Sequence, residues 1–245
     1  MIRLRPGRDR GRFRNVWLDA RFSFSFGGYR DPAFDGYSDL LVLNDDRVAP
    51  GAGFADHPHV DVEVMSYPIA GVIEHRDSLG HRALMRPGDV HLMRAGTGIR
   101  HSEMNASTVD PEHHLQWWIR PALAGLPPAY AHLKVAASEK QNQWRVLAAP
   151  DGAGGSLALA QDARVLVAVI DGSTLSYRPA PGRLTYVHVV AGEVVINGVE
   201  LHGADAAFIE RESCVAFTAP AGRPAEVLVF DLRPLAGRAG PTEAA

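Results

Sequence analysis

The stretch YPIAGVIEHRDSLGHRALMRPGDVHLMRAGTGIRHSE (residues 67–103) sets out the plan of this 245-residue chain. In it, an apolar strand-like run leads to an Ala-Gly pair, a second run, a Gly-Asp turn and a further run. The same features return in the same order in HVVAGEVVINGVELHGADAAFIERESCVAFTA (residues 188–219). A plan that is repeated in this way indicates two domains with a shared fold that arose by duplication.

The other structured segments are also short, rich in β-branched and aromatic residues, and bounded by turn formers. Examples are DLLVLN (39–44), HHLQWWI (113–119), ARVLVAVI (163–170) and AEVLVFDL (225–232). Long helical periodicity is missing. We therefore predict an all-β protein of two consecutive β-barrel domains. We expect the first domain in residues 1–125, and a linker followed by the second domain in residues 126–245.

Composition excludes several classes of protein. The net charge is −3 with histidine neutral, so no basic field points to nucleic acid. No apolar run approaches the ~20 residues that cross a bilayer, and no secretory signal is present. A single cysteine, Cys214, excludes an intrachain disulfide and fits a reducing compartment. These features predict a cytoplasmic globular protein with no nucleic-acid or membrane partner.

Four residues at two-residue spacing stand out as possible metal ligands. His57 and His59 flank a proline in ADHPHVDVEV (residues 55–64), and His101 and Glu103 lie in GIRHSEMN (98–105). Residues two apart on a strand face the same way, so each pair presents both side chains together. If the two segments are neighbours across a barrel, three imidazoles and one carboxylate converge. Such a set suits iron, manganese, nickel, copper or zinc.

A chance pair of histidines on a solvated rim is the alternative, and the second repeat serves as an internal control. Aligned on the Gly-Asp turns, Phe217 and Ala219 replace the His-x-Glu pair. Counting back from the Ala-Gly pairs puts Arg178 and Ala180 in place of the His-x-His pair. All four candidates disappear together, as they would if one duplicate had lost a metal site. This favours a metal site in the first domain and none in the second.

Several motifs together resemble the pirin family, which are bicupin proteins that include bacterial quercetin 2,3-dioxygenases. They are FSFSFGGYRDP (22–32), LVLNDDRVAPGAGFADHPH (41–59), IEHRDSLG (73–80), RPGDVHLMRAGTGIRHSE (86–103) and LQWWI (115–119). The resemblance implies two cupin (jelly-roll-like) barrels. It also implies one metal, commonly iron, held in the N-terminal barrel by residues that match His57, His59, His101 and Glu103.

The sequence departs from the family pattern at three positions. Val60 stands where an arginine often follows the HPH motif, and Pro68 and Ala70 replace more typical residues of a strand. None of these is a ligand, and we expect all three near the mouth of the pocket. Two further residues have possible roles: His75 in supporting a ligand or fixing a turn, and Glu63 as a polar neighbour of the pocket on the face of the His-x-His pair.

The leading functional hypothesis is a metal-dependent dioxygenase that cleaves quercetin or a similar enolisable aromatic with O2. Glu103 would then also accept the proton of the substrate hydroxyl, acting as the catalytic base. The rival hypothesis is a redox-sensing regulatory protein that binds a protein partner, a role also found in the family. A pocket that opens toward the metal would favour catalysis, and a closed site with an apolar surface patch would favour regulation.

Overall fold

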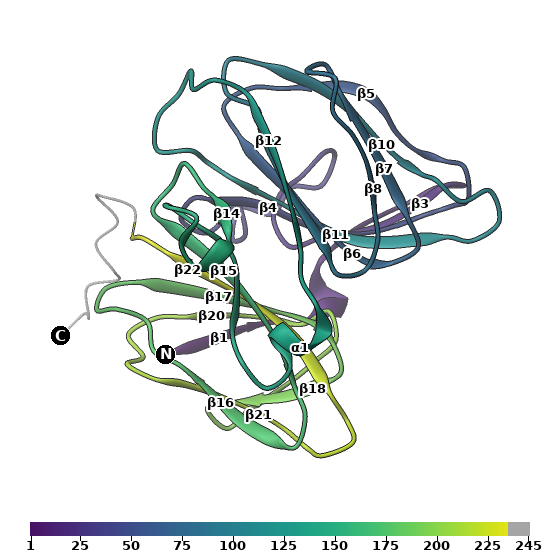
Figure 1. Cartoon of the computed structure of the whole chain (residues 1–245). Helices are drawn as coiled ribbons and strands as arrows, with labels where there is room; N and C mark the ends of the chain where they lie inside the picture. Colours follow the sequence, from purple (N-terminus) through teal and green to yellow (C-terminus); the bar gives the residue numbers. More distant parts are fainter. Residues whose placement is uncertain (235–245) are drawn as a thin grey trace.

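The computed structural model describes residues 1–234, which form four β-sheets and very little helix (Figure 1). A seven-stranded and a four-stranded sheet make up the N-terminal barrel, and a second pair of the same sizes makes up the C-terminal barrel. The predictions of an all-β protein and of two barrels are confirmed. Within the described range, no helix is long and apolar enough to span a membrane.

The N-terminal barrel has a large sheet in the order β12-β9-β6-β11-β4-β3-β2 and a small sheet in the order β5-β10-β7-β8. The large sheet contains β2 (Gly11–Arg14), β3 (Leu18–Phe22), β4 (Leu40–Val48), β6 (Glu63–Ala70), β9 (Asp89–Arg94), β11 (Glu112–Ile119) and β12 (Ala129–Lys134). The small sheet contains β5 (Gly53–His59), β7 (Ile73–Asp77), β8 (Arg82–Met85) and β10 (Ile99–Asn105).

The C-terminal barrel repeats this layout, with orders β1-β20-β17-β22-β15-β13-β14 and β16-β21-β18-β19. Its large sheet contains β1 (Ile2–Arg5), β13 (Arg145–Ala149), β14 (Leu157–Ala158), β15 (Ala163–Ile170), β17 (Leu184–Ala191), β20 (Ala206–Ile209) and β22 (Ala225–Leu232). Its small sheet contains β16 (Ser173–Tyr177), β18 (Glu193–Ile196), β19 (Val199–His202) and β21 (Val215–Ala219). The short helices are η1 (Gly7–Asp9), α1 (Ala137–Lys140) and η2 (Ala153–Gly155).

Two strands cross the boundary that we expect between residues 125 and 126. The first strand, β1, pairs with β20 of the C-terminal barrel, where Ile2 lies opposite Ile209. Conversely, β12 follows the boundary but pairs with β9 of the N-terminal barrel, where His132 lies opposite His91. Each barrel therefore completes its large sheet with a strand from the other side of the sequence, and the division at this position stays a prediction.

The large sheets of the two barrels share one apolar cluster. Leu115 and Trp117 of β11 belong to it together with Tyr186 of β17 and Phe230 of β22. The Trp117 and Phe230 rings meet edge to face, with centroids 5.4 Å apart and an interplanar angle of 87°. Edge-to-face aromatic pairs add to the free energy gained from burial, so this contact joins the two barrels.

The two barrels differ in what fills them. Leu175 of β16 pairs with Phe217 of β21, and both pack in the apolar cluster of the C-terminal barrel. In the N-terminal barrel, the strands at the same places in the sheet pair His57 with His101. The register thus puts Leu175 in the place of His57, and the alignment of Arg178 with that histidine is wrong. Counting along the chain fails here because the intervening turns differ in length.

The Ala-Gly pairs that reveal the repeat have a steric basis. Gly71 and Gly192 have φ angles of +77° and +80°, which disfavour any residue with a side chain. A Cβ on Gly192 would also collide with the carbonyl oxygen of Pro224, and one on Gly71 would collide with Glu112. Both hairpins therefore require glycine for its backbone angle and for the close approach of a neighbouring strand.

Gly192→Ala should destabilise the protein more than Gly222→Ala, whose φ is also positive at +74° but whose Cβ would meet nothing within 4 Å. The backbone cost of about 1–2 kcal/mol is common to both variants. The collision should add about 1–3 kcal/mol to the loss for Gly192→Ala alone. Urea denaturation measures the free energy of unfolding, and equal losses in the two variants would contradict the steric explanation.

Candidate metal centre

The two candidate ligand segments lie on adjacent antiparallel strands of the small sheet. His57 on β5 is directly opposite His101 on β10, and His59 is opposite Ile99. Pro58 has no backbone N–H to donate, and an edge strand tolerates this because no strand pairs with its outer side. β5 is the edge strand of this sheet. Alternation along β5 then turns both imidazoles toward the same side, which explains why a proline is tolerated between two histidines.

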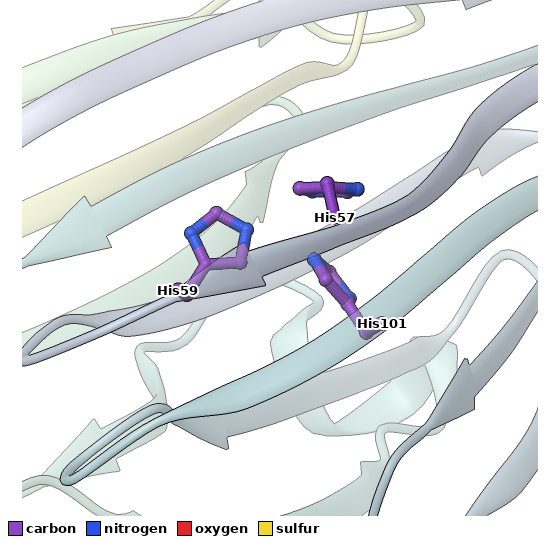
Figure 2. Close-up of side chains that lie close together, drawn as sticks. All are labelled: His57, His59 and His101. Atoms are coloured by element: carbon purple, nitrogen blue, oxygen red, sulfur yellow. The ribbon is translucent and has the colours of Figure 1, made fainter.

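Three imidazoles meet at one point, as Figure 2 shows. One potential ligand atom from each of His57, His59 and His101 lies within 4.8 Å of the others. The ring centroids are 4.8 Å apart for His57 and His59, and 4.5 Å apart for His57 and His101. This spacing brings three nitrogen donors within reach of a single ion.

The hydrogen bonds of His57 and His101 use Nδ1, which leaves Nε2 available as a metal ligand. His57 Nδ1 lies 2.7 Å from the carbonyl oxygen of Ala55 and donates to it, and His101 Nδ1 lies 3.4 Å from Nδ1 of His75. The Nε2 atoms of His59 and His101 are buried and have no partner within residues 1–234. A metal-binding histidine commonly uses its second nitrogen in a hydrogen bond that orients the ring, so the donor set fits an ion.

Burial also keeps the imidazoles of His59 and His101 neutral. It lowers the pKa of His59 to about 4 and that of His101 to about 3, with the neighbouring histidines adding to the effect. Both rings are therefore unprotonated at neutral pH. Because only neutral imidazole can ligate a metal, the folded barrel holds these side chains in the form that binds.

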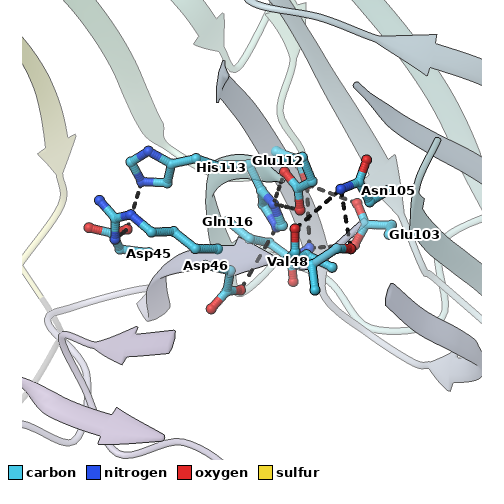
Figure 3. A network of polar contacts seen from close by, with 12 residues as sticks. Asp45, Asp46, Val48, Glu103, Asn105, Glu112, His113 and Gln116 are labelled. Atoms are coloured by element: carbon cyan, nitrogen blue, oxygen red, sulfur yellow. Dashed lines mark hydrogen bonds and ion pairs between the residues drawn. The ribbon is translucent and has the colours of Figure 1, made fainter. Parts of the chain in front are cut away.

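Glu103 lies in the polar network of the barrel interior, shown in Figure 3. Its Oε1 accepts a hydrogen bond from Ser66 Oγ at 3.0 Å, and its Oε2 accepts one from Gln116 Nε2 at 2.6 Å. Burial opposes its ionisation, but contact with His91 and the surrounding imidazoles hold the pKa of this carboxyl well below its usual range. Glu103 is therefore a carboxylate at neutral pH.

The structure brings Glu103 close to His101 but groups it differently from the other two histidines. Glu103, His101 and His75 form a second set of three whose ligand atoms lie within 4.8 Å of one another. A register shift between His101 and Glu103 interrupts the pairing of β10 with β5. Bulges of this kind redirect side chains near functional sites. That Glu103 completes a four-ligand set with His57 and His59 stays a prediction.

His75 supports the site from behind. Its Nδ1 faces His101, and its Nε2 lies 3.1 Å from Oδ2 of Asp77. The His75 ring also stacks on Tyr130, with centroids 4.8 Å apart and planes at 25°. Both ring nitrogens and one ring face are thus fixed, so His75 can hold His101 in one orientation. This placement agrees with the supporting role that we expect for His75.

A cavity of about 1290 Å³ adjoins the histidines. His57, His59 and Glu103 line it, and Val60 at its rim is 60% exposed, so the cavity opens to solvent. Its walls are mostly apolar and include the aromatic residues Trp17, Phe22, Phe26, Phe54 and Trp118. Such a cavity is typical of small-molecule sites, which are concave, mostly apolar and marked by a few polar groups.

Three expectations about the surroundings of the site need correction. Glu63 does not line the cavity, because its carboxylate accepts hydrogen bonds from the Ala160 N–H and from Arg94. The alternation that starts at His59 is broken at Asp61, whose φ of +50° ends the extended run. Pro68 and Ala70 are also absent from the cavity lining, so of the three family departures only Val60 lies at its mouth.

The sequence reasoning missed several buried polar residues near the site. His91 is fully buried, and its Nε2 lies 3.5 Å from Glu103 Oε1. His114 is also buried, with Nδ1 2.9 Å from Glu112 Oε1, a contact that helps to raise its pKa to about 9 against the effect of burial. Gln116 was likewise not singled out. Alternation along β11 could have identified these residues from the sequence, because it places residues 112, 114 and 116 on one face of the strand.

Comparison with known proteins agrees with these observations over nearly the whole chain. Residues 4–119 match the Pirin family, and residues 146–232 match the Quercetinase C-terminal cupin domain. A quercetin 2,3-dioxygenase of Escherichia coli K12 is 38% identical over 236 residues, which cover 96% of this chain and 100% of that protein. A pirin-like protein of Caulobacter vibrioides is 37% identical over 89% of this chain and 95% of its own length.

A solved structure leads to the same family. The bacterial pirin YhhW of Escherichia coli, in complex with nickel(II), superposes with a TM-score of 0.91 at 37% identity, covering 96% of this chain and 100% of that one. The fold, the two barrel domains and the relatives agree with one another. The chain is a member of the pirin family.

Proposed function

We propose that this protein is a metal-dependent dioxygenase that cleaves quercetin or a related flavonol with O2. The observation that carries the proposal is the convergence of three imidazoles beside a large cavity, rich in aromatic side chains, that opens to solvent. The names of the relatives support the same chemistry, since a protein 38% identical over its full length is a quercetin 2,3-dioxygenase.

We propose that His57, His59, His101 and Glu103 hold one divalent transition metal. Three imidazoles and a carboxylate accommodate several such ions. Iron is our choice because it is common in the family that the sequence resembles, and nickel is the ion in the YhhW complex. When bound, the ion supplies Lewis-acid stabilisation of a deprotonated substrate.

The residues of the chain then have distinct tasks. Glu103 accepts the proton of the substrate hydroxyl, a role that suits a carboxylate ionised at neutral pH. Ser66 and Gln116 hold its two oxygens and thereby aim it. The aromatic walls place a flat substrate against the ligands and exclude water from the reacting ring. The reaction inserts both atoms of O2 and releases one ring carbon as carbon monoxide.

The regulatory alternative, with a protein partner, has less support. A redox-sensing role does not need a cavity of about 1290 Å³ beside the metal ligands, whereas a flavonol substrate does. We also propose a cytoplasmic location, because a single cysteine offers no intrachain disulfide and suits a reducing compartment.

His101→Ala should abolish stable metal binding, because it removes the ligand that both sets of three share. Elemental analysis of protein purified without a metal-affinity tag should find about one ion per wild-type chain. The variant should retain less than about a tenth of that. At a metal concentration near 100 times the Kd, the ion should stabilise the wild-type fold by about 2.7 kcal/mol and leave the variant unchanged.

His202→Ala is the matched control for metal binding. His202 lies with Glu193 and Glu200 in an exposed group on the C-terminal barrel. Its loss should leave the metal content unchanged. If His101→Ala folds and keeps a full complement of metal, the proposed ligand set is wrong.

Glu103→Gln should lower turnover by about 10²- to 10⁴-fold, the usual contribution of a positioned base. Protein loaded with ferrous iron under argon is mixed with quercetin and O2, and released carbon monoxide is measured. Glu193→Gln, which alters an exposed carboxylate that does not line the cavity, should release carbon monoxide at the wild-type rate. Absence of carbon monoxide from the wild-type protein with any transition metal would refute the flavonol assignment.

A further inference from the structure

Three residues that line the cavity each carry a buried polar atom with no partner in the described part of the chain. These atoms are His59 Nε2, Asn44 Oδ1 and Asp46 Oδ1. The first is accounted for by the proposed ion. The other two belong to β4, and each residue is only 3% exposed. Because they are two apart on one strand, Asn44 and Asp46 face the cavity from the same side of the sheet.

The neighbours of this pair on β11 do not hydrogen-bond to the free oxygens of Asn44 and Asp46. Gln116, which lies opposite Asn44 on β11, donates to Glu103 and accepts a hydrogen bond from Trp118 Nε1 at 3.0 Å. The second oxygen of Asp46 lies 3.8 Å from Nε2 of His114. Only one oxygen of Asp46 is therefore near a charged partner in the protein, and the other has no hydrogen-bond partner in residues 1–234.

Two acceptors without donors are expensive in a buried position. An unsatisfied buried polar group costs roughly 1–3 kcal/mol, and more if it is charged. Burial raises the pKa of Asp46 to about 7, so this group is an acceptor at both oxygens in its ionised form, which prevails above that pH. A ligand that brings hydroxyl donors to this wall would recover the cost. An entirely apolar ligand would leave it in place.

Apolar and aromatic side chains flank this pair. Phe22 pairs with Asn44 across β3 and β4, and Ala20 pairs with Asp46. Trp118 meets His59 edge to face at 4.9 Å and meets Phe26 at 5.4 Å. A flat ring system can pack against these side chains, and its hydroxyl substituents are then the groups that can reach β4.

We propose that Asn44 and Asp46 form a recognition edge that accepts hydrogen bonds from substrate hydroxyls other than the one deprotonated at the metal. The substrate class is accordingly polyhydroxylated aromatic compounds rather than aromatics with a single enolisable hydroxyl. This inference rests on the proposed function for the identity of the aromatic ligand. It does not depend on turnover.

The test measures binding under argon, so that no oxygen chemistry contributes. Metal-loaded full-length protein is titrated with quercetin and with 3-hydroxyflavone, which keeps the enolisable hydroxyl and lacks the others. Wild-type protein should bind quercetin at least about tenfold more tightly, equivalent to about 1.4 kcal/mol. Comparable affinities for the two ligands, or no binding of either at about 1 mM, would overturn the proposal without any variant.

Variants of Asn44 and Asp46 then test whether these two residues produce the selectivity for quercetin over 3-hydroxyflavone. Asn44→Leu and Asp46→Leu keep the approximate size of the side chains and remove the acceptors. Each should weaken quercetin binding at least about tenfold and change 3-hydroxyflavone binding by less than about threefold. A parallel loss for both ligands, or no loss for quercetin, would contradict the recognition edge. Asp46→Asn, which retains one acceptor oxygen, should give a smaller loss and serves if the leucine variants fail to fold.

Thr185→Val is the matched control. Thr185 is also buried with an unpartnered oxygen, but it belongs to the C-terminal barrel and does not line the cavity. It should change neither affinity. The outcome also separates the two proposals: selective binding without carbon monoxide release would refute the dioxygenase and keep the recognition edge. Carbon monoxide release without selectivity would do the reverse.

Discussion

The cost of burying polar groups governs the N-terminal barrel. Its interior carries histidines, a glutamate and a glutamine where the C-terminal barrel carries aliphatic and aromatic side chains. Such groups are tolerated inside a protein when they are hydrogen-bonded or ligate an ion. Glu103 meets this condition through Ser66 and Gln116. The Nε2 atoms of His59 and His101 have no partner in residues 1–234, and the proposed ion would satisfy them, which connects the stability of the fold to its proposed chemistry.

The two barrels share one fold, but only the N-terminal barrel buries a cluster of polar side chains at the paired positions of its small sheet. In the C-terminal barrel, Leu175 and Phe217 occupy the paired positions and close the interior with apolar packing. In the N-terminal barrel, His57 and His101 occupy them, and a cavity adjoins the pair. One barrel therefore works as a packed support, fixed to the other by contacts such as that of Trp117 with Phe230. Rigid support of this kind keeps a metal site in its geometry.

Features that depend on local alternation could be predicted from the sequence, and features that depend on register could not. His57 and His59 share a face wherever the strand lies, because the period of an extended chain is two residues. The same rule failed for Glu63, since Asp61 adopts a φ of +50° and ends the alternation. The equivalence of Leu175 with His57, and the exchange of β1 and β12 between barrels, follow from strand pairing across the molecule. No local pattern carries that information.

The most direct test of the metal centre is anomalous X-ray diffraction from crystals of the full chain grown with ferrous iron under argon, at the absorption edge of iron. We expect one strong anomalous peak about 2.0–2.2 Å from the Nε2 atoms of His57, His59 and His101 and from a carboxylate oxygen of Glu103. A peak that instead contacts His75 and Nδ1 of His101, or no peak inside the barrel, would contradict the account.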